Sequence, residues 1–348
     1  MKILINVPDL SKHGGGVANH FNGLLPYWSM NIIYNKVGKR RGIPSEIILI
    51  YDYLKFILLC TFYKFDLIVL NPSLGKTAIQ RDTYFLNIAK LFNKKTVVFF
   101  HGWNQEMAKN ITLHPSQFSQ TFNKAEKLIV LSKDFKDSLQ KWGINIPIEI
   151  TTTKVDDSLI KDFKIERKEW NEKLLFLARI ESAKGIFITL DIYKIVKSKF
   201  PKSKLSIAGD GSKLNEAKDY AKKNHLQDVS FLGNISGSEL IDTFSSPAIY
   251  ILPTQHGEGM PTSVLEAMAF GLPIISRPVG GIVDFFEEKN MGHLINSLEP
   301  KEYAIKIINL FNNTQKLKAI GTYNHRYAKE RFIASKVADK LEGIFRTC

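Results

Sequence analysis

Short apolar runs rich in β-branched residues alternate with amphipathic stretches of helical length along the whole chain. The first half contains KILINV, NIIYNK, DLIVLN, TVVFFHG, KLIVLS and IEITTT, and the second half contains LLFLAR, KLSIAGD, VSFLGN, AIYILPT and LPIISR. Near-continuous apolar strands separated by helices are typical of parallel sheets that are covered on both faces. The two series therefore predict an α/β protein with two doubly wound domains. A length of 348 residues agrees, because it exceeds what one hydrophobic core usually organises.

A charged segment, KVDDSLIKDFKIERKEWNEK at residues 154–173, separates the two series and is interpreted as the linker. We therefore place the first domain at residues 1–155 and the second at residues 156–328. The rest of the chain, residues 329–348, has a helical pattern with no strand after it.

Composition excludes several classes of protein. The chain is 44% hydrophobic and 24% charged, which is typical of a globular protein and not of wholesale disorder. Its two cysteines, Cys60 and Cys348, form no Cys-x-x-Cys pair, so neither a disulfide framework nor a zinc site of cysteines is expected. The first residues, MKILINVPDL, predict a strand, because a signal peptide needs a longer apolar core. We expect a cytoplasmic protein.

The charge of the chain is strongly positive, at +14, and uneven: residues 1–150 contain 19 Lys and Arg against 10 Asp and Glu. Such an excess favours an anionic partner, either a nucleic acid, an anionic lipid or a phosphorylated substrate. A basic surface that only keeps the protein in solution accounts for the charge equally well.

The most apolar segment covers residues 47–70, and charged residues at positions 52, 55, 64 and 66 interrupt it. Its uncharged stretches are shorter than the roughly 20 residues that a membrane-spanning helix needs. We predict a helix over about residues 52–64, followed by a buried strand. Packing against the core is the main interpretation of this helix, and a basic, aromatic helix on a membrane surface is the alternative.

Two glutamates flank a predicted helix start in HGEGMPTSVLEAMAFGLPII, residues 256–275. Glu258 lies in the loop that follows the strand AIYILPT, Pro261 suits a first helical turn, and Glu266 lies about one turn inside the helix. The free N–H groups of residues 260–263 favour an anion. Carboxylates beside an anion site indicate a ligand with both hydroxyls and phosphates, and the alternative is a surface loop with two solvated glutamates.

Other candidates also follow predicted strands, where ligands of open α/β sheets bind. Arg179 and Lys184 follow LLFLA and suit a diphosphate, although two surface cations would look the same. The glycines at 14–16 follow the first strand and allow close approach to a phosphate or sugar, or simply form a tight turn. His101 lies at the tip of a buried strand, where it is either a structural residue or a group that faces a ligand.

Two kinds of cofactor are not expected. In IAGDGSKL, Leu214 stands where a dinucleotide-binding G-x-G-x-x-G motif needs its third glycine, so no nicotinamide cofactor is expected. The chain also has no Asp-x-Asp pair and no Cys/His cluster of zinc spacing, so no metal is expected.

Taken together, these motifs resemble glycosyltransferase family 4, the retaining transferases with the GT-B fold. The most specific element is E-x7-E, from Glu258 to Glu266, and it is supported by GGGV, HG, ARIESAKG, IAGDG and FLG, which precede it along the chain in this order. The resemblance covers nearly the whole chain. It implies two Rossmann-like domains that face each other across a cleft, with the C-terminal helix, about residues 329–348, crossing back to the first domain.

The resemblance also implies residue roles. Arg179 and Lys184 would neutralise the diphosphate of a nucleotide-sugar donor, and Glu266 would bind the ribose. Glu258 would hold the hydroxyls of the transferred sugar, with the backbone of Met260, Pro261 and Thr262.

His101 would touch the sugar near the reacting carbon and would be catalytic together with Glu258, Arg179 and Lys184. Gly15 and Gly16, grouped with the donor-binding residues, would approach the phosphates or the acceptor. Ile235, after FLG, would meet the base. Three positions depart from the family pattern, namely Ala178, TTTKVD at residues 151–156, and Asp284.

The expected activity is transfer of a hexose, without a metal or other cofactor, from a nucleotide-diphosphate sugar. A UDP-sugar is favoured as donor, and a saccharide or lipid-linked saccharide of a cell-surface polysaccharide as acceptor. Peripheral contact with an anionic membrane at its inner face is a further expectation, and no nucleic acid is expected. The alternatives are a sugar-nucleotide epimerase of the same fold and, from another class, a basic nucleic-acid-binding protein.

Overall fold

The computed structural model describes residues 1–10, 15–40, 42–255, 257 and 259–348. Its internal contacts divide the chain into two compact units. Unit 1 comprises Met1–Lys154, Gly257–Met260 and Ala334–Cys348, and unit 2 comprises Val155–His256 and Pro261–Ile333.

Unit 1 contains a six-stranded sheet in the order β2-β1-β3-β4-β5-β6, and every neighbouring pair is parallel. Its strands are β1 Lys2–Val7, β2 Asn31–Lys36, β3 Leu67–Leu70, β4 Thr96–Phe99, β5 Lys127–Val130 and β6 Ile148–Ile150. Its helices are α1 Gly16–Leu24, α2 Ser45–Phe62, α3 Lys76–Leu91, α4 Gln105–Leu113, α5 Ser116–Phe122, α6 Lys133–Lys141 and α14 Ala334–Arg346.

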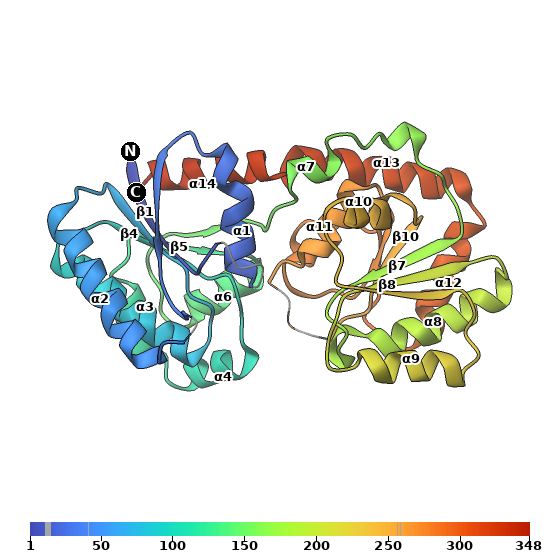
Figure 1. The fold of residues 1–348 in the computed structure, drawn as a ribbon, viewed down its shortest axis with the longest axis horizontal. Coiled ribbons are helices and arrows are strands. Elements are labelled where there is room, and N and C mark those ends of the chain that lie inside the picture. The colour runs from blue at the N-terminus through green and yellow to red at the C-terminus, as the bar shows by residue number, and fades with distance from the viewer. Residues whose placement is uncertain (11–14, 41, 256, 258) are drawn as a thin grey trace. The chain divides into compact units, whose positions relative to one another are not determined.

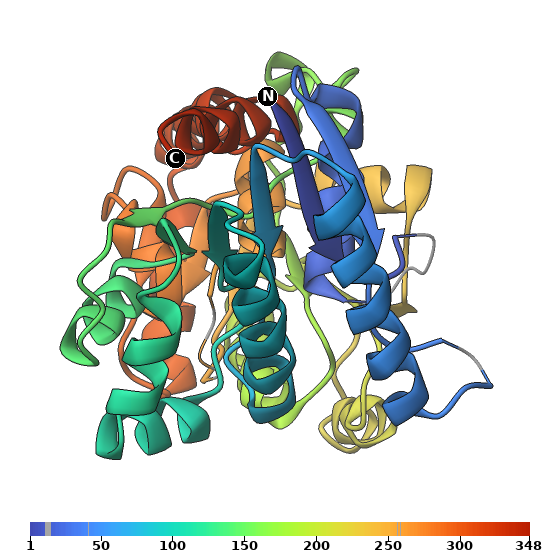
Figure 2. The same cartoon turned by 90° about the vertical axis from the view of Figure 1, so that its left-hand side faces the viewer.

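Helices cover both faces of this sheet, so its central strands are buried on both sides. The core on one face includes Phe56 of α2 and Phe85 of α3, which pack against Ile68 and Val98 of the sheet. Helices α1 and α14 lie on the opposite face from α2 and α3 (Figures 1 and 2). The buried carboxylate of Glu342 in α14 accepts hydrogen bonds from the backbone N–H groups of Ser29 (2.6 Å) and Met30 (2.9 Å). The C-terminal helix is thus an integral part of unit 1.

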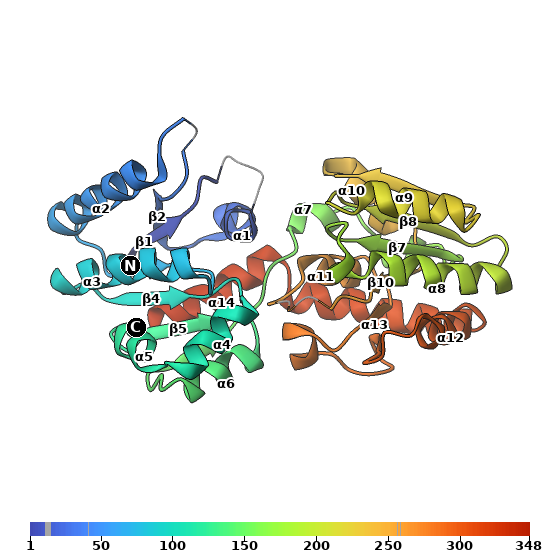
Figure 3. The ribbon, with the colours of Figure 1, turned by 90° about the horizontal axis from the view of Figure 1, so that it is seen from below.

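Unit 2 contains a second parallel sheet of six strands, in the order β12-β11-β10-β7-β8-β9. Its strands are β7 Lys173–Leu177, β8 Lys204–Ala208, β9 Val229–Gly233, β10 Ile249–Leu252, β11 Ile274–Ser276 and β12 Gly292–Leu294. Its helices are α7 Asp157–Ile160, α8 Ile186–Lys199, α9 Leu214–Lys223, α10 Gly237–Ser245, α11 Thr262–Ala269, α12 Pro300–Phe311 and α13 Thr314–Arg331. Helices α8, α9 and α12 lie on one side of the sheet and α10, α11 and α13 on the other (Figures 1 and 3).

The expected α/β architecture with two parallel sheets is confirmed, and each strand expected from the sequence is present. Two local interpretations differ from the structure. The segment interpreted as a linker packs into unit 2, where the Trp170 ring leaves no room for a Cβ atom at Gly321. The helix expected over about residues 52–64 is α2, and it begins earlier, at Ser45, directly after its N-cap residue Pro44.

Within the described residues, no helix is long and apolar enough to cross a lipid bilayer.

Candidate functional site

Each sheet reverses its strand order at one point, and the sequence-predicted residues follow the strands at these points. In unit 1 the order reverses between β1 and β3, and in unit 2 between β7 and β10. Ligands of open α/β sheets bind beyond the carboxyl ends of the strands at such a switch point. Gly15 and Gly16 follow β1, Arg179 and Lys184 follow β7, and Thr262 begins the helix after β10.

Hydrogen bonds join the turns that follow β7 and β10 in unit 2. The carbonyl of Ala183 accepts a hydrogen bond from the Gln255 backbone N–H at 2.7 Å and another from the Thr254 hydroxyl at 3.3 Å. Gly185 ends the turn in the left-handed region, with φ 84°, and a Cβ atom there would lie 2.4 Å from the Pro253 carbonyl oxygen. The close approach of these two turns requires glycine at position 185 and brings Lys184 beside the loop that leads to α11.

The two predicted cations have different environments. The Arg179 side chain is 63% exposed and forms an ion pair with Glu181 at 3.1 Å. Exposed pairs of this kind contribute little to stability, so a stronger anion can compete for this guanidinium. Lys184 lies in a short 3₁₀ turn and is only 8% exposed. The structure thus has an exposed guanidinium and a buried ammonium group after the same strand.

Two glycines of the segment IAGDG position the loop that carries Arg179. A Cβ atom at Gly209 would lie 2.0 Å from the Ala178 carbonyl oxygen, and one at Gly211 would lie 2.5 Å from the Ile180 carbonyl oxygen. The backbone N–H of Ile180 also donates to the Asp210 carbonyl at 2.9 Å. These glycines therefore allow the loops after β7 and β8 to pack against each other.

Tyr250 holds the first turn of α11 next to the end of β7. Its buried phenol donates to the Leu177 carbonyl at 2.9 Å and lies 2.7 Å from the Ser263 hydroxyl oxygen. Among the described residues, no side chain caps the helix at its N-cap residue, Pro261, and backbone N–H groups at such a helix start suit an anion. Sequence reasoning missed Tyr250, because a tyrosine within an apolar strand pattern gives no functional signal.

The remaining predicted residues of the donor side lie in different places. Glu266 is partly exposed one turn inside α11, and Ile235 is partly exposed in the loop after β9. Since β8 separates β9 from β7, Ile235 lies farther along the same edge of the sheet. Met260 is nearly buried and groups with unit 1, where the Thr153 hydroxyl donates to its carbonyl at 3.3 Å. Glu258 lies outside the described residues.

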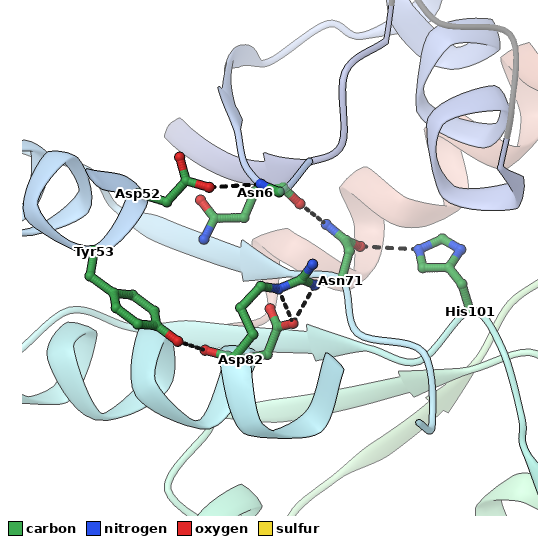
Figure 4. Close-up of polar contacts among 8 residues, drawn as sticks. Asn6, Asp52, Tyr53, Asn71, Asp82 and His101 are labelled. Atoms are coloured by element: carbon green, nitrogen blue, oxygen red, sulfur yellow. Dashed lines mark hydrogen bonds and ion pairs between the residues drawn. The ribbon is translucent and has the colours of Figure 1, made fainter. Parts of the chain in front are cut away.

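In unit 1, His101 belongs to a chain of hydrogen bonds that runs under the switch point (Figure 4). His101 Nε2 lies 3.0 Å from Asn71 Oδ1, and Asn71 Nδ2 donates to the Asn6 carbonyl at 2.8 Å. A carboxamide oxygen can only accept, so His101 donates through Nε2 and its Nδ1 is the acceptor. The orientation of the ring and its tautomer are therefore fixed by Asn71, a residue that sequence reasoning missed.

A second histidine of unit 1, also missed, packs against His101. The His20 ring lies 5.2 Å from that of His101, edge to face, and neither of its nitrogens has a hydrogen-bond partner among the described residues. Burial, together with the positive charge of Lys154, lowers the pKa of His20 to about 3. Burial and the neighbouring His20 also lower the pKa of His101 well below its usual value. Both rings are thus neutral at pH 7.

The two described glycines after β1 differ in backbone conformation. Gly15 precedes α1 with φ 125°, a conformation that side chains strongly disfavour, whereas Gly16 has ordinary geometry and open space around it. Both are exposed, and Gly14 lies outside the described residues. In the part of the chain that the structure describes, no three His, Cys, Asp or Glu side chains gather as metal ligands.

The protein thus consists of two Rossmann-like units, and the second carries two cations and a helix start after neighbouring strands of its sheet. Residues 157–327, nearly all of unit 2, match the model of the family described as glycosyl transferases group 1. Among curated proteins, the chain is 28% identical over 222 residues to an uncharacterized glycosyltransferase of Haemophilus influenzae, a match that covers 63% of this chain and 61% of that protein. It is 23% identical over 219 residues to the capsular polysaccharide biosynthesis glycosyltransferase CapM of Staphylococcus aureus, covering 62% of this chain and 57% of that protein.

These matches span less than two thirds of the length of either relative. Among solved structures, Anabaena HepE in complex with UDP-glucose superposes with a TM-score of 0.74 at 16% identity, covering 100% of both chains. The sucrose-phosphate synthase of Thermosynechococcus elongatus superposes with a TM-score of 0.75 at 14% identity, covering 100% of this chain and 99% of that one. The protein has the GT-B fold of these structures.

Proposed function

We propose that the protein is a retaining, metal-independent glycosyltransferase that moves a hexose from a nucleoside-diphosphate sugar to a saccharide or lipid-linked saccharide. The observation that carries this proposal is the junction of the turns after β7 and β10. Arg179 and Lys184 follow β7, and α11 begins after β10. Hydrogen bonds join these two turns, and both lie within residues 157–327, which match a glycosyltransferase family.

The proposed donor site follows from the charges at this junction. The diphosphate binds to the Arg179 fork and to the Lys184 ammonium, and its oxygens accept from backbone N–H groups at the start of α11. Glu266, one turn farther along the helix, binds the ribose hydroxyls, and the backbone near Ile235 meets the base. Glu258 binds the hydroxyls of the transferred sugar, together with the backbone of Met260, Pro261 and Thr262.

In the proposed reaction, the bond between the anomeric carbon and the phosphate oxygen breaks, and the bonding electrons stay on the diphosphate. Negative charge therefore grows next to Arg179 and Lys184, which stabilise it. The acceptor hydroxyl attacks the same face and gives its proton to the departing phosphate. His101, neutral and held by Asn71, presents a fixed ring to the sugar near the reacting carbon, and Gly15 and Gly16 let the backbone approach the ligand.

The choice of donor and acceptor rests on similarity. HepE is a protein with the same fold whose structure contains UDP-glucose, which favours a UDP-sugar here. CapM is named for capsular polysaccharide biosynthesis, which supports a role in cell-surface polysaccharide synthesis. Our proposal places this reaction at the cytoplasmic side of the membrane.

Donor binding can be measured by thermal unfolding in the presence of UDP-sugars and GDP-mannose, because a ligand of the native state raises the melting temperature. We expect a UDP-sugar to raise it and the variants Arg179→Ala and Lys184→Ala to abolish most of the shift. Lys218→Ala, which removes an exposed cation of α9, is the matched control. Loss of one such donor should also lower turnover by about 10²–10³-fold.

The products distinguish the proposal from its alternative. With donor alone, slow hydrolysis is the expected side reaction, and formation of an epimerised sugar nucleotide would identify an epimerase instead. Turnover should also persist in excess chelator. A donor that stabilises wild type and the Arg179→Ala variant equally would show that the junction after β7 is not the diphosphate site.

A further inference from the structure

Helix α2 of unit 1 has an unusual outer face, because large apolar side chains are exposed along its whole length. The exposed fractions are 58% for Ile47, 60% for Ile50, 51% for Tyr51, 57% for Leu54, 56% for Leu58 and 74% for Phe62. Scattered exposed apolar residues are normal on a protein surface, whereas a contiguous set marks an interaction site.

The spacing of these residues places them on one stripe. Apart from the adjacent pair Ile50 and Tyr51, they follow each other at intervals of three or four residues, which keeps them on the same side of a helix with 3.6 residues per turn. The opposite side of α2 is buried in the core of unit 1 through Ile48, Phe56 and Cys60. The stripe is therefore additional to the apolar face that folding requires.

Nothing in the described part of unit 1 covers the stripe. Figures 1 and 3 show α2 as the outermost helix of unit 1, next to α3, with no other ribbon on its outer side. On the neighbouring helix α3, Tyr84 and Leu91 are also exposed, at 59% and 79%, and the Tyr84 ring lies 5.5 Å from that of Tyr53.

Positive charge surrounds the stripe. Lys39 and Lys64 are exposed just before and just after α2, and Lys55 lies on the helix at the side of the stripe. The guanidinium of Arg40 lies 4.6 Å from the centre of the Tyr51 ring. Partial burial and the charge of Arg40 lower the pKa of Lys55, as expected where cations crowd together.

Asp52 neutralises Arg40, whereas Lys39, Lys55 and Lys64 form no ion pair within the part of the chain that the structure describes. Asp52 points inward, is 1% exposed, and binds Arg40 (2.6 Å) and the Gly38 backbone N–H (2.7 Å). Asp66 accepts from the Lys2 backbone N–H at 2.6 Å, at the other end of the helix. Only Glu46, in the first turn of α2, adds an exposed negative charge on the helix itself.

From this combination we propose that α2 docks unit 1 on an anionic lipid bilayer. The helix lies along the surface, with its apolar stripe at the boundary between headgroups and acyl chains and with Lys39, Lys55 and Lys64 at the lipid phosphates. Exposed tyrosines beside the stripe suit the same boundary. A second copy of the chain fits less well, because an isologous contact through α2 would bring these cations against themselves.

Flotation with lipid vesicles tests the docking on the full chain. We expect wild type to float with phosphatidylglycerol-rich vesicles and to stay behind with pure phosphatidylcholine vesicles or at high salt. The triple variant Ile50→Gln, Leu54→Gln, Leu58→Gln should lose on the order of tenfold or more in vesicle binding. The double variant Lys39→Glu, Lys64→Glu should also weaken vesicle binding.

The matched control is a triple variant at exposed apolar residues of unit 2, Val283→Gln, Leu298→Gln and Ile305→Gln, which are 41%, 40% and 46% exposed. It should bind vesicles like wild type. All substituted side chains are at the surface, and unchanged melting temperatures will show that each variant folds. The docking is overturned if wild type does not float with anionic vesicles, or if both triple variants bind equally well.

Light scattering without vesicles tests the alternative that a second copy of the chain covers the stripe. A dimer that the α2 variant converts to a monomer, in a protein that does not float, would assign the stripe to a second copy and overturn the lipid proposal. The docking rests on unit 1 alone. The result of the flotation experiment is thus independent of the donor-binding test, which measures how Arg179 and Lys184 of unit 2 affect the shift in melting temperature.

Discussion

The hydroxyl group of Tyr250 lies 2.7 Å from that of Ser263, so a residue in the middle of β10 holds the first turn of α11. The same phenol donates to the Leu177 carbonyl at the end of β7. One buried hydroxyl thereby fixes the helix start relative to the strand that precedes Arg179.

Replacing Tyr250 by Phe should therefore affect both stability and donor binding. We expect a loss of about 1 kcal/mol in the free energy of unfolding, the usual net value of a hydrogen bond, and a higher KM for the donor with a smaller change in kcat. Tyr193→Phe is the matched control, since this buried phenol donates to the Ser203 and Gln227 carbonyls, which precede β8 and β9. If both variants raise the KM equally, Tyr250 does not position the helix start.

His20 should make the protein sensitive to acid. Its pKa of about 3 in the folded state lies below the usual 6.5, so between these pH values the unfolded chain binds a proton that the folded chain does not. Stability due to His20 is lost as the pH falls below 6.5. We expect His20→Phe to reduce the slope of unfolding free energy against pH by up to about 1.4 kcal/mol per pH unit, measured with urea between pH 4.5 and 7.

His225→Asn is the control for this experiment, because His225 is exposed and asparagine tolerates its positive φ of 50°. Parallel curves for wild type and His20→Phe would contradict the prediction.

Lys168 should act in the opposite pH range. Burial lowers its pKa from 10.5 to about 7, although its ammonium donates to the Ser245 carbonyl at 2.9 Å. Between pH 7 and 10.5 the unfolded chain binds the extra proton, so stability rises with pH in this window. Lys168→Met should remove this rise. The free energy of unfolding of wild type should therefore increase relative to that of the variant as the pH increases from 7 to 10. Lys218→Met, at an exposed site, should keep the slope of wild type.

Gly185→Ala should strongly destabilise unit 2. The new Cβ atom would meet the Pro253 carbonyl at 2.4 Å on a backbone with φ 84°, and we expect a cost of about 1–3 kcal/mol. Gly343→Ala is the contrasting variant, since Gly343 lies inside α14 with open space around it, and alanine should stabilise the helix by about 0.5–1 kcal/mol. Chemical denaturation of both variants measures the two effects.

The sequence predicted the strands well because apolar runs such as DLIVL and TVVFF have no polar alternation and are bounded by turns. It missed β12, Gly292–Leu294, whose three residues include a glycine and a histidine. It also placed the start of α2 too late, because Ile47–Ile50 is equally compatible with a strand. The outer face of this helix could not be recognised, since burial depends on which elements lie beside it.

The candidate site was only partly predictable. Arg179 and Lys184 follow a strand in the sequence, and this position was enough to select them. Tyr250 and His20 act through contacts with segments that are remote in the chain, and those contacts follow from the order of strands in each sheet. Their residue types have ordinary structural roles, so only the three-dimensional arrangement distinguishes them.

The membership of α14 in unit 1 has a consequence for biosynthesis. Residues 334–346 leave the ribosome after all of unit 2. The backbone N–H groups of Ser29 and Met30 therefore have no Glu342 carboxylate to bind until α14 has been synthesised. Unit 2 can fold as soon as it emerges, whereas unit 1 stays incomplete until its last helix arrives. The face of unit 1 that α14 covers is therefore exposed from the synthesis of α1 until the synthesis of α14, and a chaperone that shields this face would act throughout that time.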